Sequence, residues 1–246
     1  MFEASLGNVF RLYRASLSRC WLPSLLLALA WGWAATLVDR RLGSSDDLPV
    51  WLAQVQALAW SGYFWRLLIA ASALSAFLYS AIVADIYAVA TGGATPAMAG
   101  LLAALRAFPV VVVASTIFLV VTSMATALFI IPGAYLWGMW QLWLVVAVVE
   151  RCGPIEALRR SWQLMVGSWW RITTLITLVT IVSTLPPLLF DTVAGSMLIM
   201  VGRAAVHAPP VVTAVGIALD VFLIPLIPAA LVAAYLDRQR APAVLG

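Results

Sequence analysis

Long, nearly continuous apolar runs alternate with short polar breaks along this chain. A run such as 110–131 lacks the alternation of apolar and polar positions that is typical of strands in a membrane barrel. About 20 consecutive apolar residues are enough for a helix to cross a bilayer. The pattern therefore predicts an all-α polytopic membrane protein with six transmembrane helices. The predicted spans are 20–38, 61–84, 109–131, 134–149, 170–189 and 211–236.

Amphipathic segments lie between the spans. The clearest is 154–167, where apolar residues recur at steps of three and four while Arg159 and Arg160 occupy the opposite face. Similar patterns predict surface helices over 2–19 and 97–107, and an interfacial helix over 49–60 on the outer side. A signal peptide is the alternative for the N-terminal region, but the run 20–38 is long enough to span and contains three tryptophans.

Proline and glycine mark the expected breaks. Pro132 and Gly133 predict the turn between the third and fourth spans, and Pro186 and Pro187 predict a bend or end of the fifth span. Residues 190–210 are then an outer connection, either partly helical or re-entering the membrane interface.

Composition supports a membrane protein. Hydrophobic residues make up 64% of the chain, charged residues 10%, and the mean hydropathy is +1.04, whereas a soluble domain is about half apolar and about a quarter charged. Arginine supplies all the strongly basic side chains, and the net charge is +4. Ten arginines fall on the side that carries both predicted termini and four on the other. The excess of positive charge on that side predicts that both termini lie in the cytoplasm.

The order surface helix, span, outer turn, span occurs three times. The predicted repeat units, about 1–91, 92–152 and 153–246, form a single integral membrane domain over 1–246. Each unit ends its second span with an acid, at Asp85, Glu150 and Asp237. We expect these acids to meet the arginine-rich surface helices in a cytoplasmic collar, with Glu150 pairing with the helix that bears Arg159 and Arg160.

Two charges, Asp220 and Arg66, lie at least one helical turn inside predicted spans. Asp220 is the deepest, and a charge at that depth is costly unless it is paired or functional. It is either a polar site for a proton or an ion, or an acid paired with Arg66 or Arg203. Arg66 is close enough to the outer end of its span to reach the headgroups. The twelve tryptophans are typical of interfacial belts more than of a ligand cage.

Catalytic and metal-binding patterns are missing from the sequence. It contains no nucleophile elbow, no zinc-protease pattern and no phosphate-binding glycine loop. His207 is the only histidine, and Cys20 and Cys152 are the only cysteines, so neither a metal site nor a disulfide is expected. We expect no enzymatic activity, no cofactor and no nucleic-acid partner.

The segment 131–171 resembles the YciC-like bacterial inner membrane proteins. It is also similar to the module named after the membrane domain of glycerophosphoryl diester phosphodiesterases. The residues that carry the resemblance are Pro154, Glu156, Ala157, Leu158, Ser161, Trp162, Leu164, Gly167, Trp169 and Trp170. The resemblance implies a polytopic inner membrane protein of poorly defined role. No phosphodiesterase activity is expected to carry over, because the soluble catalytic domain of those fusions is not in this sequence.

These observations favour a scaffold or lipid-interacting module whose basic collar engages anionic headgroups. The alternative is a small transporter or channel with a polar site near Asp220.

Overall fold

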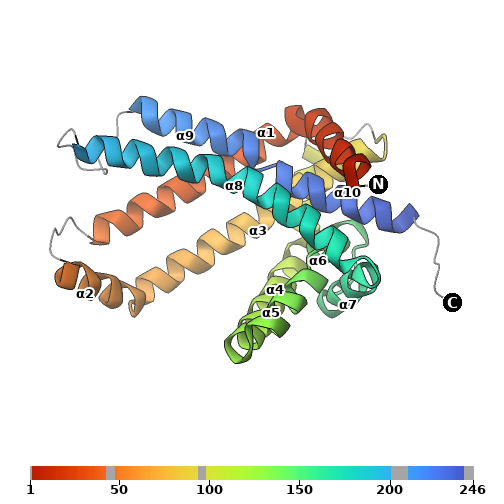
Figure 1. The fold of residues 1–246 in the computed structure, drawn as a ribbon, viewed down its shortest axis with the longest axis horizontal. Helices are drawn as coiled ribbons and strands as arrows, with labels where there is room; N and C mark the ends of the chain where they lie inside the picture. The colour runs from red at the N-terminus through yellow and green to blue at the C-terminus, as the bar shows by residue number, and fades with distance from the viewer. Residues whose placement is uncertain (1, 43–47, 94–97, 201–209, 241–246) are drawn as a thin grey trace.

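The computed structural model describes residues 2–42, 48–93, 98–200 and 210–240, and every regular element in those ranges is an α-helix (Figure 1). The helices are α1 (Phe2–Leu42), α2 (Leu48–Ala59), α3 (Gly62–Ala90), α4 (Met98–Leu128), α5 (Ile130–Met139), α6 (Trp143–Val149), α7 (Pro154–Met165), α8 (Trp169–Met200), α9 (Pro210–Leu223) and α10 (Leu226–Arg240).

Six stretches within these helices are long and apolar enough to cross a membrane. They are Leu6–Val38, Gly62–Ala90, Ala99–Leu128, Ile130–Val149, Trp169–Met197 and Val211–Arg240. The predicted fold class, an all-α polytopic membrane protein with six spans, is therefore confirmed. The predicted outer helix 49–60 is also present, as α2.

Two predicted surface helices are continuous with the spans that follow them. α1 runs unbroken through Pro23, and α4 runs unbroken through Pro109, so the predicted ends of the helices 2–19 and 97–107 were wrong. Figure 1 shows the first part of α1 running in a different direction from the rest. A proline removes one helical hydrogen bond and can bend a helix without ending it. Residues 94–97 lie outside the described ranges, so the predicted start of the second helix is not covered.

The fifth span also continues past its prolines. α8 contains both Pro186 and Pro187 and extends to Met200, so the predicted end at residue 189 was wrong. Residues 190–200 of the expected outer connection are helical, whereas 201–209, which include Arg203 and His207, lie outside the described ranges. Ending a helix inside lipid would leave backbone groups without hydrogen-bond partners, so continuing past a proline costs less.

The fourth and sixth spans are each divided into two helices. The turn after α4 lies at Phe129, whose backbone is extended (φ −153°, ψ 126°), and not at Pro132 and Gly133 as predicted. Pro132 stands in the first turn of α5, where backbone N–H groups have no helical partner. A break at 140–142 then separates α5 from α6, and a turn at 224–225 separates α9 from α10.

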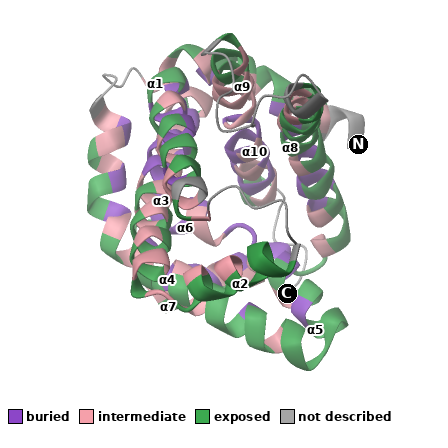
Figure 2. Cartoon of the chain, turned by 90° about the vertical axis from the view of Figure 1, so that its left-hand side faces the viewer, coloured by how far each residue is buried: buried purple, intermediate pink, exposed green. Residues whose placement is uncertain are grey.

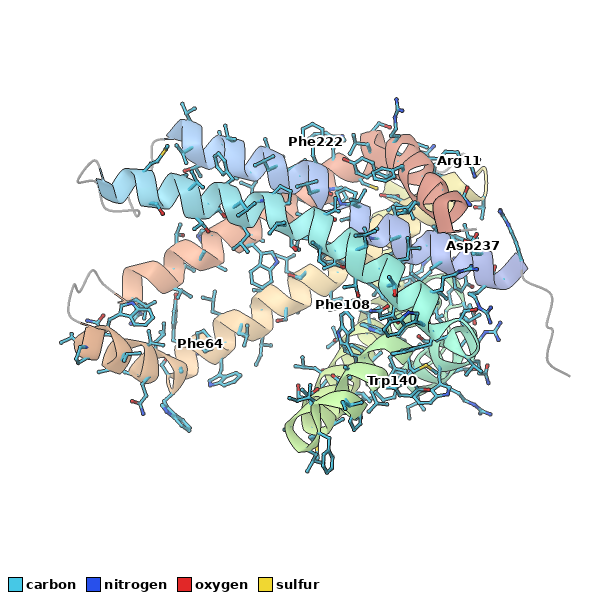
Figure 3. The ribbon with its side chains drawn as sticks, in the orientation of Figure 1. Arg11, Phe64, Phe108, Trp140, Phe222 and Asp237 are labelled. Carbon is cyan, nitrogen blue, oxygen red and sulfur yellow. The ribbon has the colours of Figure 1, made fainter. Side chains whose placement is uncertain are left out.

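Buried residues gather at one end of the bundle, which we call the core end. It is built by the second half of α3, the inner face of α7, the first half of α8, and α6 and α10. Figure 2 shows α10 largely buried among the surrounding helices. At the opposite end, which we call the open end, large apolar side chains on α2, α8 and the first half of α3 are exposed. Figure 3 shows Arg11 and Asp237 at the core end and Phe64 at the open end.

The threefold repeat stays a prediction. Among the three predicted surface helices, only the third, α7, is a separate element in the described ranges.

Candidate functional site

Ser161 fixes α7 to the bundle. Its hydroxyl accepts a hydrogen bond from the Leu142 N–H (3.1 Å) and donates one to the Met139 carbonyl (3.2 Å). Both backbone groups belong to the break between α5 and α6, where the helical hydrogen bonds are interrupted. Buried backbone groups that lack partners are costly, so this one side chain stabilises both the break and the position of α7.

Glu150 connects α7 to α10. Arg160 Nε lies 3.4 Å from Glu150 Oε1, which is the contact expected from the sequence. The Tyr235 hydroxyl donates to the same oxygen (2.9 Å), and the Gln239 amide donates to Tyr235 (2.5 Å). The ion pair is partly exposed, so by itself it contributes at most about 1 kcal/mol to stability. The hydrogen bond from the buried Tyr235 makes the stability of the fold depend further on Glu150.

We predict that Glu150→Lys destabilises the protein by about 2 kcal/mol, because it places two cations together and deprives the buried Tyr235 hydroxyl of its acceptor. The double variant Glu150→Lys, Arg160→Glu should recover about half of this loss, since only the ion pair is rebuilt. Folded yield and thermal midpoint in detergent measure both effects. An unchanged yield and midpoint in the single variant would contradict the prediction. The double variant Glu150→Lys, Arg159→Glu is the charge-matched control for the rescue and should recover less.

Arg238 holds the segment that follows α7. Its guanidinium donates to the carbonyls of Leu164 (2.7 Å) and Val166 (3.2 Å) and to the hydroxyl of Ser168 (2.9 Å). The neighbouring Asp237 is half-buried on α10 and is not without a partner. α10 is therefore linked to the middle of α7 through Glu150 and Arg160, and to the end of α7 through Arg238.

The outer face of α7 is exposed. Ile155, in its first turn, is 72% exposed. A groove of about 470 Å³ lies between α4, the α5–α6 break and α7. Apolar side chains, among them Ile117 and Trp162, line most of it, and Arg159 supplies its charge. An apolar groove beside an arginine suits the chain and the headgroup of an anionic lipid.

The three collar acids occupy different environments. Glu150 pairs with Arg160, whereas Asp85 is buried near the end of α3 and lines a pocket together with Arg106 and Arg151. Arg151 has a positive φ of 51°, a conformation that costs a non-glycine residue about 1–2 kcal/mol. Such strain persists only where the surroundings impose it.

Asp220 does not contact Arg66 in the structure. Arg66 is exposed, and its Nε donates to the Gly62 carbonyl (3.0 Å) one turn before it. Asp191 of α8 lies beside α9 instead: a Cβ added at Gly216, one turn before Asp220, would be 3.5 Å from an Asp191 carboxylate oxygen. Sequence reasoning missed Asp191 because it placed that residue in an outer loop after the prolines.

Other contacts were also missed. Ser161 belongs to the residues that carry the family resemblance, but its bridge to the α5–α6 break has no local signal in the sequence. The hydrogen bonds of Tyr235 and Arg238 also have no local signal in the sequence, because their partners lie about 70–85 residues away.

Comparison with protein family models, curated proteins and solved structures gives no match. The resemblance to the YciC-like proteins and to the phosphodiesterase membrane module therefore stays a prediction. Any proposal about function depends on the contacts described above.

Proposed function

We propose that the chain is a non-enzymatic, multi-pass protein of the bacterial inner membrane that binds anionic lipids at its core end and serves as a scaffold there. The observation that carries this proposal is the groove beside α7, which combines apolar walls with Arg159. α7 is held by Ser161, Arg160 and Arg238. Its inner face is thus used for packing, and its outer residues are available to lipid.

Binding of an anionic lipid should depend on Arg159. A single basic side chain near an anionic surface contributes about 1 kcal/mol, so Arg159→Gln should weaken binding of phosphatidylglycerol about fivefold. Native mass spectrometry of the purified full chain, titrated with that lipid, measures the change. Arg66→Gln is the matched control, because Arg66 is an exposed arginine at the open end. Equal binding by wild type and Arg159→Gln would contradict the proposal.

The arginine distribution supports a cytoplasmic core end. Cys152, in the segment between α6 and α7, offers a direct test, because it is partly exposed whereas Cys20 is buried. A membrane-impermeant maleimide should label Cys152 in inside-out vesicles and not in spheroplasts. Cys152→Ser should abolish the labelling, and labelling in spheroplasts alone would reverse the proposed orientation.

The rate of this labelling should rise with pH. Partial burial, together with the charges of Glu150 and Glu156, raises the pKa of the Cys152 thiol above its ordinary value. Fewer thiols are then ionised at neutral pH, and the thiolate is the reactive form. Glu150→Gln removes one of the charges that raise the pKa, so it should speed labelling at pH 7.5. A slower reaction in that variant would contradict this assignment.

The neighbouring carboxylates Asp191 and Asp220 favour a second candidate function, a small transporter or channel. Two acids close together within helices that span the membrane can hold a proton or a cation. This candidate requires cation flux into proteoliposomes that Asp220→Asn abolishes. Flux that is absent, or equal in wild type and variant, favours the scaffold.

A further inference from the structure

A small pocket lies at the core end between the end of α3, the start of α4 and Arg151, with a volume of about 240 Å³. Asp85 lines it and is only 5% exposed, yet it makes no hydrogen bond or ion pair with any residue in the described ranges. Arg19 of α1 acts on Asp85 from beyond ion-pair distance, and its guanidinium donates to the Gly93 carbonyl (3.5 Å). A buried carboxylate without a close cation is costly, so the pocket has one strong, unused acceptor.

Two cations line the same pocket. Arg106 comes from α4 and Arg151 from the segment after α6, and both are exposed. Arg151 keeps its strained backbone at this place. Paired guanidinium groups beside a small cavity are well suited to bind a phosphate group, because each can donate two parallel hydrogen bonds.

An apolar groove continues from the pocket. It has a volume of about 760 Å³, is bounded by α1, α3 and α4, and shares Ala99 and Leu102 with the pocket. Leu78 and Leu74 precede Asp85 in α3 and lie about two and three turns from it, toward the open end. The polar pocket therefore lies near the end of a membrane helix, and the groove leads from it toward the middle of the bilayer.

We infer that this pocket and groove together bind one aminophospholipid. The phosphate lies between Arg106 and Arg151, the headgroup ammonium lies against Asp85, and an acyl chain occupies the groove. The pocket offers two cations and one carboxylate, and a phosphoethanolamine headgroup offers one anion and one cation separated by a short linker. The charges on the two sides are thus complementary.

The same arrangement discriminates against anionic lipids. Phosphatidylglycerol would fill the groove and its phosphate would reach the arginines, but its neutral glycerol headgroup would leave Asp85 without a cation. Discrimination by an unpaired buried group is stronger than discrimination by shape alone. This site is separate from the α7 groove, so the inference goes beyond the proposed function and does not depend on it.

The test uses the purified full chain and native mass spectrometry with phosphatidylethanolamine and phosphatidylglycerol of identical acyl chains. Because phosphatidylglycerol is also proposed to bind the α7 groove, the comparison is made in the Arg159→Gln chain. That chain should bind phosphatidylethanolamine about tenfold more tightly than phosphatidylglycerol. Adding Asp85→Asn, which keeps the size of the side chain, should abolish this preference. Adding Arg106→Gln and Arg151→Gln should weaken binding of phosphatidylethanolamine. Equal affinity of the Arg159→Gln chain for both lipids, or an unchanged preference after Asp85→Asn is added, overturns the inference.

A second variant covers the case in which Asp85→Asn fails to fold. Leu102 is 49% exposed and lines both pocket and groove, so Leu102→Trp should fill part of the site without changing charge or core packing. The folded variant should lose phosphatidylethanolamine binding, and retained binding overturns the inference.

Arg159→Gln separates the two lipid sites. It should leave binding of phosphatidylethanolamine intact while weakening that of phosphatidylglycerol. If Arg159→Gln binds phosphatidylglycerol as tightly as wild type, the α7 proposal is rejected. If Asp85→Asn keeps the preference for phosphatidylethanolamine, the pocket is rejected.

A Cβ at Gly100 would overlap the Asp85 carboxylate. Gly100→Ala should therefore reduce the preference for phosphatidylethanolamine with no change of charge. An intact preference counts against the pocket.

Discussion

Ser161→Ala should destabilise the protein by about 2–4 kcal/mol, since each buried backbone group that loses its partner costs about 1–3 kcal/mol. Ser161 is fully buried, and its hydroxyl is hydrogen-bonded to both the Met139 carbonyl and the Leu142 N–H. The alanine leaves these two groups unpaired in a site that is closed to water. Because the serine also joins α7 to the α5–α6 break, we expect α7 to loosen at the same time.

Unfolding by SDS titration, followed by tryptophan fluorescence, measures the loss of stability. Ser196→Ala is the control: the Ser196 hydroxyl is exposed and bonds only within its own helix, to the Thr192 carbonyl (2.7 Å). Its effect should stay within about 0.5 kcal/mol. Similar losses in the two variants would show that the Ser161 bridge does not stabilise the fold.

Gly133→Ala should destabilise the protein by about 2 kcal/mol. An alanine normally favours a helix over glycine by about 1 kcal/mol, but here the new Cβ would lie 2.6 Å from the Cα of Thr126 and 2.7 Å from its backbone nitrogen. Backbone atoms cannot move aside as a flexible side chain can, so α5 must shift away from α4. Overpacking of this kind costs about 1–3 kcal/mol or more.

The matched control is Gly195→Ala in α8, where an added Cβ meets no atom within 4 Å. That variant should be neutral or more stable by up to about 1 kcal/mol, because only helix propensity changes. The same SDS titration compares the two. A stabilising effect of Gly133→Ala would mean that α4 and α5 do not pack as closely as described.

Hydropathy was sufficient to predict the number of spans. The six apolar runs in the sequence correspond to the six stretches of the structure that are long and apolar enough to cross a membrane. Such runs form helices because a helix satisfies its own backbone hydrogen bonds in lipid. The amphipathic period of α7 predicted part of its packing, since Leu158 and Met165 are buried while Arg159 is exposed. Ile155 belongs to the same apolar stripe but is exposed.

Proline was a misleading signal for helix ends. In water, a proline often ends a helix because solvent can satisfy the freed carbonyl. At Pro109, Pro186 and Pro187 the helix continues, because lipid offers no such partner. This error hid Asp191, which the continued α8 brings to α9.

Contacts between distant segments could not be read from local pattern. The break at 140–142 has no proline, and its stabilising hydroxyl comes from Ser161, about twenty residues later. The sequence singled out Asp85 as one of the three collar acids. It gave no sign that Asp85 is buried without a close cation, because that depends on how α3 and α4 pack.

The division of the fourth span has a consequence for the surrounding bilayer. Its 20 residues reach at most about 30 Å, whereas the second span, with 29 residues in one helix, reaches about 44 Å. A bilayer with a hydrocarbon thickness of about 30 Å fits the former directly and the latter only if the helix tilts or projects beyond it. Hydrophobic mismatch therefore differs around the perimeter of this one protein. We expect the lipid leaflets to be thinner beside α5 and α6 than beside α3, so the protein would favour membrane regions whose thickness varies over a short distance.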